Sequence, residues 1–356
     1  MSDSIPVAVP AAQLSCPVPI AGHSHVMLGH GSGGRLSAEL MRDIFMPAFQ
    51  NPILAALDDQ ATLPMEAGRI AFSTDSFVVK PLFFPGGNIG ELAVYGTVND
   101  LAVGGAVPRY LSAAFILEEG LAMETLKSVV DAMAQAAARV GVQIVTGDTK
   151  VVERGSGDEL FITTAGIGVV PDGCMLSSRQ VQVGDRILLS GPLGDHGITI
   201  LSQREGLELD GNLTSDAAPL HEVCGDLVRH VPGLHAMRDL TRGGLSSALN
   251  EMAATSRTGM EIVERDIPVR DNVRGACELF GLDPLYVANE GKLIAFVAPD
   301  GAEAAVQIMR RWDVSQQARM IGTVTERHVG RVTLRTSFGT ERIVTMLAGD
   351  QLPRIC

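Results

Sequence analysis

Acidic side chains stand where short apolar runs end, and they are the first residues in this chain that could do chemistry. Asp75 ends the run in "AFSTDS", Asp148 ends "IVTGD", and Asp100 lies in the apolar segment "YGTVNDLAVGG". An unpaired buried carboxylate is costly, so each needs a cation, a hydrogen-bond network or an exposed strand end. Taken singly, a cap or turn role explains each one. With Asp58 and Asp59 in "ALDDQATL", they predict a group of carboxylates at one sheet edge.

Glycine-rich turns could supply the complementary half of such a site. Carboxylate oxygens without neighbouring His or Cys favour Mg²⁺, and Mg²⁺ commonly brings substrate phosphates with it. Backbone N–H groups at glycines can approach these anions. Three turns qualify, although none has the spacing of a P-loop or of a dinucleotide-binding fold: "LGHGSGGR" (28–35), "SGPLGDHGIT" (190–199) and "RDLTRGGLSS" (238–247). The third runs into an expected helix, whose N-terminus favours phosphate.

A free thiol is a further candidate group. The five cysteines are an odd number and form no CxxC pair, which argues against a disulfide framework or a zinc site: Cys16, Cys174, Cys224, Cys277 and Cys356. Cys356 is the last residue. Lys150, which follows Asp148 closely, could neutralise a transferring phosphoryl group, and Glu290 in "VANEGKL" could act on protons. The residues alone therefore predict a metal-dependent nucleotide enzyme with a free terminal thiol.

Composition limits the partners. The formal net charge is −13 and the sequence pI is near 5.0, so neither nucleic acid nor an anionic membrane surface is an expected ligand. Mean hydropathy is +0.21, but no apolar stretch is long and charge-free enough for a membrane span, and the first residues lack the basic start of a secretory signal. We expect a cytoplasmic protein.

The elements that must position these residues form two α/β domains. Residues 1–24 are rich in Pro and Ala and predict a loose extension. From 25 to 175 the pattern is strand, helix, strand: "RIAFSTD", then the helix 121–140 with Gly141 as its stop, then "VQIVTGD". A polar turn near 176 predicts a second domain over 176–345, with strands "DRILLSG" and "LIAFVA" and the helix "GLSSALNEMAATS". Residues 346–356 predict a mobile tail that carries Cys356.

The motifs together resemble one known family. "HGSGG", "FSTDS", "TVNDLAVGGAVPRYLS", "TGDTKVV", "GDHG", "DLTRGG", "NEGKL" and the terminal "PRIC" are similar to the hydrogenase maturation proteins of the HypE family, from about residue 26 to Cys356. The resemblance implies the two-domain architecture of the aminoimidazole ribonucleotide synthetase (PurM-like) superfamily, with mixed sheets and helices and with ATP and Mg²⁺ as cofactors.

The resemblance also implies an activity. Members of that family carry a carbamoyl group on the terminal cysteine and use ATP to dehydrate it to a protein thiocyanate, the source of the cyanide ligands of [NiFe]-hydrogenase iron. Phosphorylation makes the amide oxygen a leaving group, bases remove two N–H protons, and a nitrile remains. Cys356 would then be a covalent substrate carrier, loaded through its thiolate.

Roles for individual residues follow from the resemblance. Asp59, Asp75, Asp100 and Asp148 are expected to handle Mg²⁺ and the ATP phosphates, and Asp58 adjoins Asp59. Gly31, Gly33 and Gly34 would close over the phosphates, and Asp239 and Arg242 would serve the loop that faces them. Lys150, His196 and Glu290 are expected to stabilise charge and remove protons, in an order that the sequence leaves open.

The resemblance further implies the carbamoyltransferase HypF and a HypC–HypD iron-loading complex as partners, and a homodimer whose interface includes "PLFFPGG" and "LAVYGTV". Three alternatives stay open at this stage: a small-molecule kinase or amidine-forming synthetase of the same superfamily, a non-catalytic thiol carrier, and a lipidated terminus. The last is disfavoured because a prenylation box needs Cys fourth from the end, where this chain has Pro353.

Overall fold

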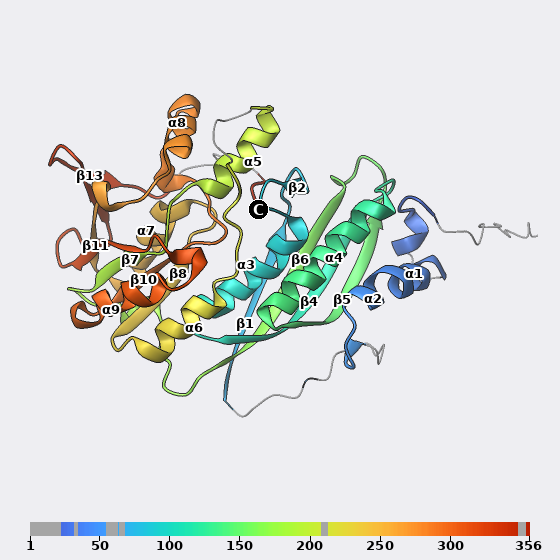
Figure 1. The fold of residues 1–356 in the computed structure, drawn as a ribbon, viewed down its shortest axis with the longest axis horizontal. Helices are drawn as coiled ribbons and strands as arrows, with labels where there is room; N and C mark the ends of the chain where they lie inside the picture. The colour runs from blue at the N-terminus through green and yellow to red at the C-terminus, as the bar shows by residue number, and fades with distance from the viewer. Residues whose placement is uncertain (1–22, 32–34, 55–62, 64–67, 208–212, 348–353) are drawn as a thin grey trace, which may run out of the picture.

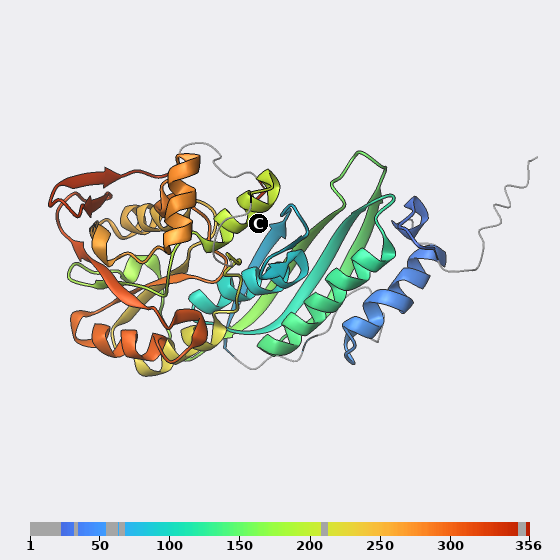
Figure 2. The same ribbon diagram turned by 45° about the horizontal axis from the view of Figure 1, so that its top comes forward.

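The chain folds into two lobes that lie side by side (Figures 1 and 2), each built on its own sheet. A computed structural model describes residues 23–31, 35–54, 63, 68–207, 213–347 and 354–356. In lobe 1 a four-stranded sheet has the order β1-β6-β4-β5, and two long helices pack on one of its faces. The elements of lobe 1 are η1 (Leu28–Gly31), α1 (Arg35–Leu40), the π-helical η2 (Met41–Phe45), α2 (Met46–Ala48), β1 (Arg69–Phe77), β2 (Phe83–Phe84), β3 (Gly87–Asn88), α3 (Ile89–Val103), β4 (Val107–Glu118), α4 (Met123–Val140), β5 (Gln143–Val152) and β6 (Leu160–Val170).

Helix α4 forms where the sequence predicts it. Apolar residues recur at helical spacing along it, and the buried ones, from Leu126 to Val140, form the face that packs on the sheet. Gly141 ends the helix in the left-handed region, with φ 73°, which glycine adopts without steric cost. The helix connects β4 to the parallel strand β5, so the crossover unit is β4-α4-β5, whereas the strand expected before the helix was "RIAFSTD", which is β1.

Helix α3 is a correction to the sequence interpretation. Of its 15 residues, all but Glu91 and Asp100 are buried, because it lies between the sheet of lobe 1 and elements α6 and β8 of lobe 2. A helix buried all round has no polar face to reveal its period. Asp100 therefore lies in a helix and not at a strand end. The segment 92–98, expected at a dimer interface, is instead part of the core.

Lobe 2 is a seven-stranded sheet covered on both faces, with the order β13-β12-β9-β11-β7-β10-β8. Every residue of β10 is buried, because its side chains alternate between two cores. Ile294 and Phe296 pack under α7, and the other three residues, Leu293, Ala295 and Val297, pack under α6 and α9. Its elements are η4 (Ser178–Gln180), β7 (Arg186–Leu189), α5 (Asp195–Glu205), α6 (His221–His230), β8 (Leu234–Asp239), α7 (Gly244–Ser256), β9 (Gly259–Val263), η5 (Glu264–Asp266), α8 (Asp271–Phe280), η6 (Pro284–Tyr286), β10 (Leu293–Val297), α9 (Pro299–Met309), η7 (Asp313–Ser315), β11 (Arg319–Thr325), β12 (Val332–Arg335) and β13 (Glu341–Val344).

The face of the lobe 1 sheet opposite α3 and α4 is open, and we call it the open face. Strand alternation places Phe72, Ile70, Val107 and Ile116 on it. Phe72 is 69% exposed and Ile70 is 58% exposed. Contiguous apolar side chains of this kind on a sheet mark an interaction surface. No described helix is both long and apolar enough to span a membrane.

Candidate active site

Four acidic residues from both lobes converge where the lobes meet, and we call them the interlobe carboxylates: Asp75 on β1, Asp100 on α3, Asp239 at the end of β8, and Glu290 before β10. Gly96 on α3 lets β1 approach closely, since an added Cβ would lie 2.8 Å from the Phe77 ring and 3.6 Å from Oδ2 of Asp75. The Ser73 hydroxyl donates to Oδ2 of Asp100 at 2.7 Å. Of the carboxylates expected at one sheet edge, only Asp75 and Asp100 meet here, and Asp239 and Glu290 of lobe 2 join them.

A cavity of about 470 Å³ opens beside these residues. Ser73 and Asp100 line it from lobe 1, and Arg238 and Asp239 line it from lobe 2. Cavities of this size between domains are the usual place for a cofactor.

Burial and mutual repulsion shift the protonation of the interlobe carboxylates. Burial, followed by the nearby Asp100 charge, raises the pKa of Asp239 to about 7. Burial also raises the pKa of Asp75 and of Asp100. For Glu290, burial together with neighbouring carboxylates raises the pKa well above its ordinary value, and its Oε1 has no hydrogen-bond partner among the described residues. Two arginines oppose these shifts only in part: Arg238 favours the charged forms of Asp100 and Asp239, and Arg242 favours those of Asp75 and Glu290, but both arginines are exposed.

Asn99 holds the two lobes together next to Asp100. From α3 it donates through Nδ2 to the carbonyl of Ala218 at 3.1 Å and accepts from the Leu220 N–H at 2.7 Å. Its side chain is buried, so both contacts bridge the lobes away from water. Asn99 fixes the distance between Asp100 on one lobe and the carboxylates of the other.

Asp148 and Lys150 on β5, with Gly31 of η1 beside the strand, form a separate set, which we call the β5 group. The Lys150 ammonium lies 2.9 Å from Oδ1 of Asp148 and lowers the pKa of that carboxyl. Both side chains are more than 60% exposed. Gly31 is required where η1 crosses the strand, since a Cβ there would lie 2.4 Å from the Val151 nitrogen. Gly31 and Lys150 are therefore neighbours.

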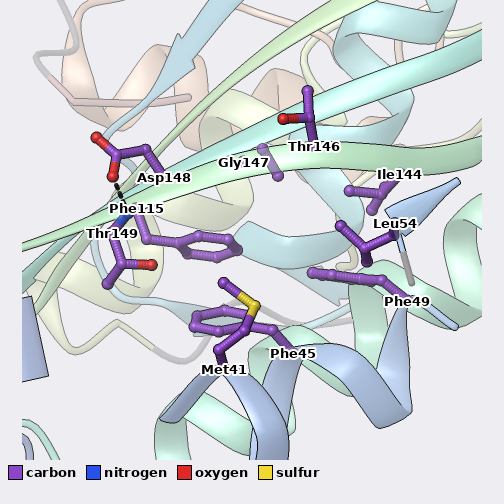
Figure 3. A pocket seen from close by; sticks show the side chains of 11 residues that line it. Met41, Phe45, Phe49, Leu54, Phe115, Ile144, Thr146, Gly147, Asp148 and Thr149 are labelled. Carbon is purple, nitrogen blue, oxygen red and sulfur yellow. Dashed lines mark hydrogen bonds between the residues drawn. The ribbon is translucent and has the colours of Figure 1, made fainter. Parts of the chain in front are cut away.

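Asp148 points away from the helices that cover the lobe 1 sheet. Figure 3 shows Phe45, Phe49 and Phe115 enclosing a small apolar pocket between the sheet and η2–α2, with the Asp148 carboxylate directed to the opposite side. The pocket holds only about 30 Å³, which is the size of a packing gap and too small for a ligand.

The strand register separates Asp148 from Asp75 within one chain. Asp75 pairs with Thr164, Thr164 with Ala113, and Ala113 with Gly147, so the two acidic residues lie on opposite edges of the sheet. Three strand spacings amount to about 14 Å. Asp75 also shares a face with buried Thr164, whereas Asp148 lies on the open face. One chain therefore cannot bring both carboxylates to a single Mg²⁺, contrary to the expectation of one sheet edge.

Three further members of the expected set, Asp59, Gly33 and Gly34, lie outside the described residues. Within the described ranges, no three His, Cys, Asp or Glu side chains form a preassembled metal site.

The terminal tripeptide, Arg354–Ile355–Cys356, is docked between the lobes. The Val78 N–H donates to the Cys356 carbonyl at 2.9 Å. Ile355 and Cys356 are 2% and 8% exposed, and they share a core cluster with Ile200 and Ala288 of lobe 2. Figure 1 marks this end of the chain between α5 and β2. The tail was expected to be mobile; the structure shows its last three residues in a bound position, and Ala288 stands two residues before Glu290.

His196 on α5 binds the backbone of this tripeptide. Its Nε2 lies 2.7 Å from the Ile355 carbonyl, which can only accept, so Nε2 carries the proton. Its Nδ1 lies 2.8 Å from the Ser215 hydroxyl, which donates to it. Burial lowers the pKa of His196. With both ring nitrogens engaged, the neutral imidazole holds the chain end in place, a role that differs from the expected removal of a substrate proton.

Three charged residues, Asp158, Lys80 and Arg204, hold Arg354 in place, and we call these four residues the clamp. The Arg354 guanidinium pairs with Asp158 and lies 5.6 Å from the centre of the Phe161 ring. Asp158 also pairs with Lys80 at 2.7 Å. Arg204 of α5 donates to the carbonyls of both Lys80 and Arg354. Sequence reasoning missed Asp158, Lys80, Arg204 and Asn99; of the clamp, only Arg354 had a signal, because it belongs to "PRIC".

Comparison with known proteins gives consistent matches along the chain. The family profile "AIR synthase related protein, N-terminal domain" matches residues 57–170, and "AIR synthase related protein, C-terminal domain" matches residues 182–335. A relative from Azotobacter vinelandii named "Carbamoyl dehydratase HypE" is 52% identical over 331 residues, covering 93% of this chain and 97% of the relative.

Solved structures agree. "Crystal Structure of Hydrogenase Maturation Protein HypE in complex with ATP" superposes with a TM-score of 0.90 at 49% identity, covering 93% of this chain and 99% of that one. "Crystal structure of HypE-HypF complex" gives a TM-score of 0.76 at 46% identity, covering 86% and 99%.

Asp239 should make the metal-free chain less stable as pH rises. Below its ordinary pKa of 3.8 the carboxyl is protonated in both states; between that value and about 7 only the unfolded state releases the proton. Asp239→Asn removes this effect. Between pH 4 and pH 8 the free energy of unfolding of this variant, measured relative to wild type, should therefore rise by on the order of 1–3 kcal/mol. Urea unfolding in EDTA at both pH values measures it. Asp131→Asn, an exposed exchange on α4, is the control, and equal pH slopes for wild type and Asp239→Asn would contradict the assignment.

Loss of the clamp should expose the terminal thiol. Asp158→Asn leaves Arg354 without its carboxylate partner, so alkylation of Cys356 should speed up several-fold as the docked population falls. Iodoacetamide labelling followed by mass spectrometry of the C-terminal peptide reports the rate. Asp131→Asn should label like wild type. Protection that survives the loss of Asp158 would show that the clamp does not hold the tripeptide.

Proposed function

This chain belongs to the HypE family of carbamoyl dehydratases, and from that premise we propose that it uses ATP to dehydrate an S-carbamoyl group on Cys356 to a protein thiocyanate. The observation that carries the proposal is the docked terminal tripeptide. It brings the last cysteine of the chain to the junction of the lobes, next to His196 and to the segment that bears Glu290. The product would supply cyanide ligands for [NiFe]-hydrogenase iron.

The reaction needs ATP because an amide oxygen is a poor leaving group. Transfer of the γ-phosphoryl group to the carbamoyl oxygen gives ADP and a phosphorylated imidate on sulfur, with loss of one N–H proton. Loss of the second N–H proton and cleavage of the C–O bond then give the S–C≡N group and inorganic phosphate. The sum is one ATP consumed and the elements of one water removed from the carbamoyl group.

Glu290 is our candidate for accepting a proton in these steps. A carboxyl whose pKa is raised by burial is a stronger base than an ordinary carboxylate, which suits proton removal near neutral pH. Its backbone N–H donates to Oδ1 of Asp216 at 3.0 Å, which holds it in position. His196 would orient the chain end through the Ile355 carbonyl. Lys150 would stabilise phosphate charge.

The interlobe carboxylates fit Mg²⁺. They offer only oxygen atoms, and burial raises their pKa values, a cost of the charged forms that a bound hard divalent cation would offset. Asp75, Asp100 and Asp239 would hold the ion. Mg²⁺ would neutralise the ATP phosphates. Arg242, Asp59, Gly33 and Gly34 remain proposed contributors to nucleotide binding.

We further propose a homodimer formed through the open face. This face exposes Phe72, Ile70 and Ile116, and the β5 group lies at its edge. Packing two open faces together would bury these apolar side chains. Asp148 and Lys150 of one chain would then reach the nucleotide bound by the interlobe carboxylates of the other.

HypF is the proposed donor of the carbamoyl group, and a HypC–HypD complex is the proposed acceptor of cyanide.

Cys356→Ala should abolish carbamoyl-dependent ATP hydrolysis and leave ATP binding within about twofold of wild type, because only the tethered substrate is lost. Cys277→Ala, a buried thiol on α8, is the matched control and should retain turnover. Phosphate release with a carbamoyl donor system and nucleotide titration measure the two effects. Wild-type hydrolysis in Cys356→Ala would exclude the terminal cysteine as carrier.

Subunit complementation tests the shared site. Asp75→Asn and Asp148→Asn should each lose ATP turnover. Mixed dimers contain one site free of both changes, so they should recover about half of the wild-type rate. Mixing Asp75→Asn with Asp100→Asn, two members of the interlobe carboxylates, should recover nothing. Complementation fails if both carboxylates serve a site in the same chain.

A further inference from the structure

In the glycine turn that begins at Ser190, His196 is the only residue given a role in the reaction described above; Gly191 and Asp195 have none. The turn leads from β7 into α5 and lines a cavity of about 410 Å³ within lobe 2, which we call the polar cavity. Two cationic and three acidic residues line it: Arg270, Lys292, Asp195, Asp216 and, at the exposed rim, Asp313. A cavity whose walls pair charges in this way is suited to a small, strongly polar ligand.

Lys292 supplies positive charge to the polar cavity. It is 7% exposed, and its stem crosses Gly191 so closely that a Cβ there would lie 3.1 Å from Cε. Its ammonium lies 2.9 Å from Oδ2 of Asp216 and donates to the Gly291 carbonyl at 3.2 Å. An ammonium has three N–H donors. Among its contacts within the described residues, one donor is left for a ligand.

Asp195 supplies an acceptor without a partner. It is 1% exposed, and its Oδ2 lies 3.4 Å from Nε of Arg270. Its Oδ1 is buried and accepts no hydrogen bond from any described residue. A buried acceptor left unsatisfied is costly. A ligand that donates a hydrogen bond to Oδ1 while accepting from Lys292 and Arg270 would satisfy all three groups.

Inorganic phosphate has this combination, because at neutral pH it keeps a P–OH donor beside anionic oxygens. Sulfate has the same shape but only acceptors. We propose that the polar cavity binds inorganic phosphate, recognised through its P–OH group by Asp195 and through its anionic oxygens by Lys292 and Arg270. The N-terminus of α5, at the same wall, favours an anion.

The position of the polar cavity suggests where this phosphate comes from, and this step alone rests on the proposed function. Asp216, on the cavity wall, accepts the backbone N–H of Glu290, and the adjacent Ser215 donates to His196. The cavity is thus one layer of residues from the docked tripeptide. Cleavage of the C–O bond during dehydration releases one phosphate per turnover, and the cavity would receive it.

The test compares the binding of phosphate with that of sulfate by isothermal titration calorimetry on the full-length, nucleotide-free protein. We set the pH at about 7.5, where phosphate keeps a P–OH group and the Asp195 carboxyl is charged, and hold the ionic strength constant. Wild type should bind phosphate, with sulfate weaker by about tenfold or more, because an acceptor-only anion leaves Oδ1 of Asp195 unpaired. Equal affinities, or binding of neither anion, would overturn the proposal. This comparison needs no variant to fold.

Asp195→Asn assigns the discrimination to the polar cavity. The asparagine amide can donate to sulfate, so the preference for phosphate should fall to about twofold or reverse. Asp313→Asn, the same exchange at the exposed rim, should keep the wild-type preference. Circular dichroism melts establish that both variants fold. An unchanged preference in folded Asp195→Asn would place phosphate elsewhere and overturn the proposal.

The outcome is separable from that of the proposed function. Anion discrimination is measured without turnover, so it can succeed in a chain whose Cys356 never carries a carbamoyl group. Conversely, carbamoyl dehydration by a chain that does not distinguish the two anions would refute the phosphate site alone.

Discussion

The central constraint in this structure is the fixed position of two lobes that bury a short chain end between them. A buried backbone carbonyl must find a donor, and the two carbonyls of Ile355 and Cys356 find theirs in the His196 ring and the Val78 N–H. These donors belong to different lobes. The terminal tripeptide can therefore bind only while the lobes keep their relative position, which Asn99 and the wholly packed helix α3 maintain. The docking site and the interlobe carboxylates are consequences of the same arrangement.

The interlobe carboxylates show the cost of such a site. Burial raises the pKa of several acidic groups at once, and the described residues offer them little positive charge. A protein that bound no ligand here would be more stable with uncharged side chains at these positions. Their retention is understandable if cations and phosphates complete the site, because functional sites are where local stability is given up.

Some of this could be predicted from the sequence, and the failures have physical reasons. Helix α4 was predictable because it is half-buried and shows its period, whereas α3 was not, because it is buried on every side. Residue types identified Asp75 and Asp100, and the family resemblance added Asp239, but separating Asp148 from this group required the strand register. The clamp was not predictable, since Lys80, Asp158, Arg204 and Arg354 are far apart along the chain and each alone resembles a solvated surface charge. The resemblance to a known family identified the role of Cys356. The odd number of cysteines and the terminal position of this one suggested only a free thiol.

The most direct test of the central claim is the mass of the C-terminal peptide through one reaction cycle. After incubation with a carbamoyl donor system, Cys356 should gain the mass of a carbamoyl group, and on addition of ATP and Mg²⁺ that peptide should lose the mass of one water, with one phosphate released for each water lost. A carbamoylated Cys356 whose mass stays constant while ATP is hydrolysed would contradict the account, as would a mass change on any other cysteine.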